Sequence, residues 1–145
     1  MIIKPSKKET TAKPKYKKAT KIKKLFKKMK GTSKLETTFE EILIDLGINY
    51  VHHYRFGKRE FDFCCTDYNL VIEVDGDFFH VNEARGYEVK YPFQKRTIKN
   101  DRFKDKLVAK SNDYTLIRFW EYDINNNKAS VILDLINELN RLGKR

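Results

Sequence analysis

The stretch Leu70-Val71-Ile72-Glu73-Val74-Asp75-Gly76 decides how this chain folds. A short apolar run that ends at a glycine is typical of a strand in a packed sheet, yet this run carries two carboxylates near its end. Burying carboxylates together costs far more free energy than an apolar core supplies, unless a cation is shared. The stretch therefore predicts a strand that ends at a polar site.

The segments before this strand predict the first half of an α/β fold. Three short runs rich in aromatic and β-branched residues, separated by turn residues, indicate an antiparallel meander: Tyr50–Phe56, Glu60–Thr66 and Leu70–Asp75. A helix is predicted before the meander, because the capping-box pattern Ser33-Lys34-Leu35-Glu36 is followed by apolar residues at helical spacing as far as Gly47.

The segments after the strand complete the order αβββαβα. Residues 81–97 have no clear period, and a mostly helical stretch is predicted over Ile98–Lys110. Tyr114–Trp120 is predicted as another strand, and apolar residues at helical spacing indicate a final amphipathic helix from Val131 to Leu142. A chain with this order is expected to place helices on both faces of a central mixed sheet.

The charge of the chain is concentrated at one end. Residues 1–30 contain 13 lysines and the single acid Glu9, whereas residues 31–145 contain 18 basic and 19 acidic residues. Since little of the first segment could bury an apolar face, we expect a flexible, Lys-rich tail attached to one domain over residues 31–145. A polycationic tail suits nucleic acid, and a solubilising or nuclear-targeting-like lysine run is the alternative.

Hydropathy and cysteine content indicate the compartment. No window approaches the roughly eighteen continuous apolar residues that a membrane span requires, and the first residues are too polar for a secretory signal. The two cysteines, Cys64 and Cys65, are neighbours within an apolar run and are expected to be reduced. We therefore expect a soluble protein of the cytoplasm.

A second carboxylate position strengthens the prediction of a polar site. In Phe61-Asp62-Phe63 an acid interrupts an aromatic strand next to the strand of Glu73. The two carboxylates could converge on a hard divalent cation such as Mg²⁺, which prefers oxygen ligands. The alternative is that alternation places both acids on the solvent face of an amphipathic strand, and His80, four residues beyond the glycine, favours the site.

Five blocks of sequence stand in one order: Ser33-x-x-Glu36, Asp62-Phe63, Ile72-Glu73-Val74-Asp75-Gly76-x-Phe78-Phe79-His80, Asp101-x-x-Lys104 and Ile117-Arg118-Phe119-Trp120-Glu121. Together they resemble the very-short-patch-repair-like (Vsr-like) branch of the PD-(D/E)xK nuclease superfamily, which includes repair nicking enzymes and phage homing endonucleases with a Glu, Asp, His, Asp site. The resemblance implies a restriction-endonuclease-like fold. It also implies a phage or mobile-element homing or nicking endonuclease that hydrolyses double-stranded DNA with Mg²⁺ or Mn²⁺, as a monomer or homodimer.

The resemblance also implies roles for individual residues. The catalytic set would be Glu36, Asp62, Glu73, Asp75, His80 and Asp101. The metal would be held by Asp62, Glu73 and the Val74 carbonyl, Glu36 would orient the attacking water, and His80 would transfer a proton. Asp75 stands where the superfamily has its lysine, so that His80 or Lys104 would have to substitute for that base.

Several of these residues have a plainer interpretation from the sequence itself. The capping box explains Glu36, and Glu40, one turn later, lies on the same helix face. Asp101 could belong to an ordinary solvated helix face. The adjacent His52 and His53, on a predicted strand, are expected to point to opposite sides, one into the core and one to the surface.

A basic segment follows His80. Residues 85–110 contain nine basic and three acidic residues interleaved with aromatic ones. This composition predicts contact with the DNA backbone and stacking on bases, through Arg85, Lys90, Tyr91, Lys95, Arg96, Lys99 and Lys104. A flexible loop with Tyr91 and Phe93 in the core is the alternative. Rival functions are a catalytically inactive DNA-binding accessory protein of the same fold, a structure-specific repair or recombination nuclease, and a Lys-tailed structural module.

Overall fold

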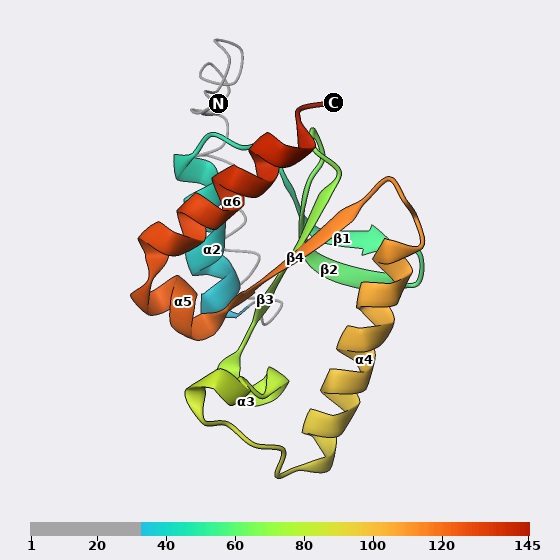
Figure 1. Ribbon diagram of the computed structural model, residues 1–145, viewed down its shortest axis with the longest axis vertical. Helices are drawn as coiled ribbons and strands as arrows, with labels where there is room; N and C mark the ends of the chain where they lie inside the picture. Colours follow the sequence, from blue (N-terminus) through green and yellow to red (C-terminus); the bar gives the residue numbers. More distant parts are fainter. Residues whose placement is uncertain (1–32) are drawn as a thin grey trace.

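Four strands form one mixed sheet in the order β1-β2-β3-β4, as the computed structural model of the chain shows (Figure 1). β1 (Val51–Phe56), β2 (Arg59–Cys65) and β3 (Leu70–Asp75) are antiparallel neighbours, and β4 (Thr115–Trp120) pairs in parallel with β3. The structure describes residues 33–145, so the tail expected over residues 1–30 lies outside the described residues. The predicted α/β fold with a mixed central sheet is confirmed.

The helices cover both faces of this sheet. α2 (Lys34–Asp45), α5 (Glu121–Asn126) and α6 (Lys128–Leu142) lie on one face, and α4 (Pro92–Ala109) lies on the other (Figure 1). The short helix α3 (Asp77–His80) and the 3₁₀ turn η1 (Glu83–Arg85) connect β3 to α4. None of the helices within residues 33–145 is long and apolar enough to span a membrane.

The ends of two helices explain where the sequence prediction held and where it failed. α2 begins at the predicted capping box, in which Ser33 Oγ accepts from the Glu36 N–H at 3.1 Å and Glu36 Oε2 accepts from the Ser33 N–H at 3.2 Å. α4 begins at Pro92, six residues before the predicted start at Ile98. Its first turns carry exposed basic residues, and its buried residue there is Gln94, so no apolar stripe marks them.

β3 is buried along its whole length and separates two kinds of surroundings. Leu70, Ile72 and Val74 face the apolar core formed with α2, α5 and α6, whereas Glu73 and Asp75 point to the face that α4 covers. Glu73 is 4% exposed and Asp75 is 3% exposed. The alternative interpretation, in which Glu73 lies on a solvent face, is therefore wrong.

The hairpin of β1 and β2 departs from simple alternation at His53, whose φ is +55°. The His52 ring stacks on Phe63, on the α2 side, whereas Tyr54 packs with Phe61 on the α4 side. Because the backbone turns between them, the His52 and His53 rings stack on one another at 3.8 Å. One histidine is buried and one exposed, as expected, with side-chain exposures of 4% for His52 and 43% for His53, but the expectation that they point to opposite sides is wrong.

Truncating a buried leucine of α6 tests the packing of the core. Leu135 is fully buried and Leu133, on the same helix, is 58% exposed. We expect Leu135→Ala to lower the free energy of unfolding by about 2–5 kcal/mol, because transfer and cavity effects add. Leu133→Ala, the matched control, should change it by less than about 0.5 kcal/mol. Urea denaturation of both variants measures the difference, and equal losses would contradict the packing described.

Candidate active site

A cavity of about 770 Å³ lies at the carboxyl ends of β3 and β4, between α2, α3 and α4. Six residues that the sequence predicts as catalytic or metal-binding line it: Glu36, Asp62, Glu73, Val74, His80 and Asp101. They come from five segments, since Glu36 is on α2, Asp62 on β2, Glu73 and Val74 on β3, His80 on α3 and Asp101 on α4. The fold thus gathers residues that are up to 65 positions apart around one space.

The acidic floor of the cavity is formed by Asp62 and Glu73. Asp62 Oδ2 accepts a hydrogen bond from the Val74 N–H at 2.8 Å, which holds the carboxylate against the end of β3. Burial and the charge of Glu73 raise the pKa of Asp62 to about 9, despite the bond from Val74. Two carboxylates so close that the charge of one raises the pKa of the other are stabilised by a proton or by a cation.

Lys104 provides one positive charge at this floor. Its Nζ donates to Glu73 Oε1 at 2.8 Å and lies 4.9 Å from the centre of the Phe61 ring. The side chain is 13% exposed, so Lys104, which the sequence predicts as a DNA contact, lies inside the cavity. This placement fits the other role that the resemblance implied, that of a base near the carboxylates.

His80 belongs to a network of charged groups on the α4 side of β3. His80 Nδ1 lies 2.6 Å from Asp101 Oδ2 and 3.6 Å from Asp75 Oδ1. Burial by itself lowers the pKa of His80, but the hydrogen bond with Asp101 and the charge of Asp75 outweigh burial and raise it. Asp101 is thus a partner of His80, and the interpretation of Asp101 as a member of a solvated helix face does not hold.

Asp75 and Arg118 stand behind His80. Arg118 Nη1 donates to both carboxylate oxygens of Asp75, at 3.0 and 3.2 Å, and Arg118 Nη2 lies 2.9 Å from Asp105 Oδ1. Burial raises the pKa of Asp75, although His80 and Arg118 act against it. Asp75, which the sequence predicts as catalytic, therefore lies behind His80 and is not among the residues that line the cavity, whereas Asp101 lines it.

Glu36 both caps α2 and lines the cavity. Its Oε2 caps α2, and its Oε1 lies 3.1 Å from His52 Nε2 while the residue lines the cavity. Burial raises the pKa of Glu36, but hydrogen bonds from His52 and Ser33 outweigh burial and lower it to about 2. Glu40, the alternative on the next turn, is 2% exposed and accepts from the Tyr50 hydroxyl at 2.8 Å within the core.

The predicted DNA contacts other than Lys104 lie on the surface. Their side chains are exposed: Arg85, Lys90, Tyr91, Lys95, Arg96 and Lys99. Arg96 also lines the cavity. Tyr91 is 48% exposed and stacks on Phe93 at 5.6 Å, so the alternative that buried Tyr91 in the core is wrong.

The aromatic side chains at this rim form one cluster. Phe78 packs against Phe79, Tyr91 and Phe93 at centroid distances of 5.4, 6.0 and 5.8 Å. Phe79 is 58% exposed and Phe78 is 40% exposed. A rim that combines basic side chains with exposed rings can contact both phosphates and bases.

Sequence reasoning missed the roles of Arg118 and His52. Arg118 appeared within one of the five blocks without a role, although a cation between Ile117 and Phe119 on a strand is itself a sign of a buried acidic partner. His52 and His53 are expected from the sequence as one core and one surface residue, and the contact of His52 with Glu36 depends on the backbone turn at His53, which no local pattern marks.

Comparisons with known proteins bear on the fold. No protein-family model matches the chain, and no curated protein matches it. Among solved structures, the chain is similar to the catalytic domain of the homing endonuclease I-Bth0305I, with a TM-score of 0.53. The similarity covers 74% of this chain and 94% of that one, at 20% sequence identity. At this identity the similarity shows that the two chains share a fold.

The raised pKa of His80 leads to a titration test. Because Asp101 and Asp75 favour the imidazolium, they stabilise the fold below about pH 6.5, and this contribution is lost as the pH rises through the folded pKa of His80. We expect the His80 resonance in NMR to titrate above pH 6.5 in the wild-type chain and lower in Asp101→Asn. Asp105→Asn, on the same helix but paired with Arg118, is the control. An unchanged pKa in Asp101→Asn would contradict the proposed pairing.

Proposed function

We propose that this chain is a metal-dependent DNA endonuclease. The observation that carries the proposal is the convergence of Asp62, Glu73 and the His80–Asp101 pair on one cavity beside a basic, aromatic rim. Phosphodiester hydrolysis requires an activated water, neutralised phosphoryl oxygens and a proton for the leaving oxygen. Each requirement has a candidate group among these residues.

The donor set at the cavity floor fits a hard divalent cation. Asp62, Glu73 and the Val74 carbonyl offer oxygen alone, which suits Mg²⁺ or Mn²⁺. The floor has one cation, Lys104, for two carboxylates, and Asp62, whose pKa is raised to about 9, holds a proton where a second cation could bind. Such an ion supplies Lewis-acid neutralisation of the phosphate and lowers the pKa of an attacking water.

The protein groups around this floor have separate tasks. Glu36 stays ionised, since its pKa is lowered to about 2, and its carboxylate orients the attacking water by accepting a hydrogen bond. His80, held through Nδ1 by Asp101, presents its other nitrogen, Nε2, to donate a proton to the leaving oxygen. The raised pKa of His80 favours the protonated form that this step needs.

Duplex DNA is the substrate that the surroundings support. The exposed basic side chains of α4 and of the loop before it lie beside the cavity, where a phosphate backbone would pass. The similar fold of a homing endonuclease catalytic domain supports the same substrate class. We extend the proposal to a homing or nicking enzyme of a phage or mobile element, which acts in the cytoplasm as a monomer or homodimer. In this proposal residues 31–145 are the nuclease domain, and residues 1–30 are a tail that binds the DNA backbone.

Removing the Asp62 charge tests the metal requirement. We expect the wild-type chain to cut supercoiled plasmid with Mg²⁺ or Mn²⁺ and Asp62→Asn to lose cutting, with duplex affinity within a few-fold. Asp62→Asn should be at least as resistant to unfolding without divalent cations, because it removes a carboxyl whose raised pKa makes its burial unfavourable at neutral pH. Asp113→Asn, in an exposed turn, is the matched control.

The outcomes of this experiment separate the rival functions. Full cutting by Asp62→Asn, or cutting in excess chelator, would remove Asp62 as a metal ligand. Tight duplex binding by a wild-type chain that cuts no duplex with either cation would favour the catalytically inactive accessory protein. Cutting confined to branched or mismatched duplexes would favour the structure-specific repair nuclease.

The basic rim is tested by a salt titration of DNA affinity. Arg96→Ala should weaken duplex binding and reduce the slope of log affinity against log salt by about 0.9, the value of one lost phosphate contact. Lys128→Ala, an exposed cation at the start of α6 on the other face of the sheet, should leave the slope unchanged. If both variants change the slope equally, the rim has no special part in binding.

A further inference from the structure

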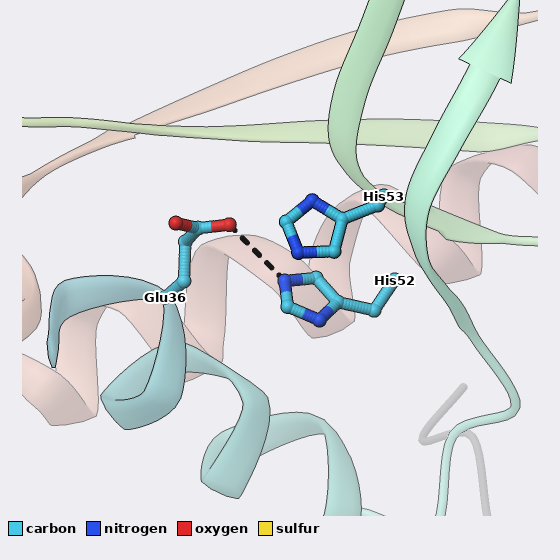
Figure 2. A group of neighbouring side chains, drawn as sticks. All are labelled: Glu36, His52 and His53. Atoms are coloured by element: carbon cyan, nitrogen blue, oxygen red, sulfur yellow. Dashed lines mark hydrogen bonds and ion pairs between the residues drawn. The ribbon is translucent and has the colours of Figure 1, made fainter. Parts of the chain in front are cut away.

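A second group of metal-binding side chains lies between α2 and β1. A carboxylate oxygen of Glu36 and one ring nitrogen each of His52 and His53 lie within 4.8 Å of one another. Figure 2 shows the Glu36 side chain pointing from α2 toward the two stacked imidazole rings of β1, with His52 bonded to Glu36. These two histidines have no part in the nuclease proposal.

The backbone brings the two rings together. The positive φ of His53 is a conformation that residues other than glycine rarely adopt, and it turns the His53 side chain onto the face of His52. The His52 ring is itself fixed between the rings of His53 and Phe63, whose centroids lie 3.8 and 4.6 Å from its own. A conformation of this kind persists where its surroundings determine it, often at a functional site.

Further carboxylates stand behind each histidine. His53 Nδ1 lies 2.9 Å from Glu60 Oε1, and His52 Nδ1 lies 3.6 Å from Glu40 Oε2. Histidines that bind a metal through one nitrogen usually give the other N–H to a carboxylate, which fixes the ring and its tautomer. Glu60 holds His53 through Nδ1, so that His53 offers Nε2, and His52 Nε2 already faces Glu36 Oε1.

We propose that Glu36, His52 and His53 bind a divalent transition-metal ion such as Zn²⁺ or Co²⁺. Two imidazole nitrogens and one carboxylate oxygen form a set that zinc sites use, with a further position for solvent, and two imidazoles disfavour Mg²⁺. The His53 side chain is 43% exposed, which leaves the ion a route from solvent. Since the ion must lie near the plane of each ring, binding splays the two stacked rings apart.

The site links α2 to β1 and shares one residue with the cavity. Glu36 caps α2 through Oε2 and offers Oε1 to the ion, so the helix start can be kept on binding. Binding of the ion does not depend on the nuclease proposal. If both hold, an ion at this position withdraws Glu36 from the attacking water and slows Mg²⁺-dependent cleavage.

The test is binding of Zn²⁺ and Co²⁺ to the full chain, by calorimetry and by the visible absorption of Co²⁺. The chain has three histidines, so NMR can follow each ring. His53→Gly removes one ligand and tolerates the positive φ, so this variant should fold. We expect it to lose at least tenfold in Zn²⁺ affinity, Glu60→Gln to lose about tenfold, and His80→Gln, the control, to bind as the wild type does.

The outcomes separate this site from the candidate active site. In the wild-type chain the His52 and His53 resonances should move with Zn²⁺ while excess Mg²⁺ leaves them in place. Equal affinity in His53→Gly and wild type, or a loss confined to His80→Gln, would overturn the proposal. The buried cysteines Cys64 and Cys65 are unchanged in every variant, so a thiolate signature in the Co²⁺ spectrum would also contradict it.

Discussion

The burial of Glu73 and Asp75 under α4 is the constraint on which the rest of the structure depends. Each carboxylate is paired with a cation from a different element, Glu73 with Lys104 of α4 and Asp75 with Arg118 of β4. A buried charge left without its partner costs about 3–5 kcal/mol, so these pairs fix where α4 and β4 lie against β3. The position of α4 in turn places Asp101 against His80.

This constraint places the buried charged groups on the face of the sheet toward α4, beside a smaller apolar cluster. The face toward α2, α5 and α6 carries the main core, and the face toward α4 carries the carboxylates and their cations. Glu36 reaches the cavity from the apolar side because it stands at the very start of α2. The same carboxylate faces His52, so one residue connects the proposed nuclease site and the proposed transition-metal site.

The sequence was sufficient where local chemistry decides the structure and insufficient where tertiary contacts do. The strand of Glu73, its two neighbours and the cap at Ser33 were predicted, because apolar runs, turns and capping residues mark them. The first turns of α4 were missed because they consist largely of exposed basic residues, so that no apolar residues at helical spacing mark them. The stacking of the His52 and His53 rings was missed because it depends on a positive φ at His53, and no glycine in the sequence marks that position.

Anomalous diffraction from crystals of the chain soaked in Mn²⁺ tests the central claim most directly, because it locates the ion without reference to activity. We expect a peak bounded by the carboxylates of Asp62 and Glu73 and the carbonyl of Val74. We also expect Lys104 to move away from Glu73 as the ion takes its place. A map with these side chains ordered and no peak between them, or with density only beside His52 and His53, would contradict this claim.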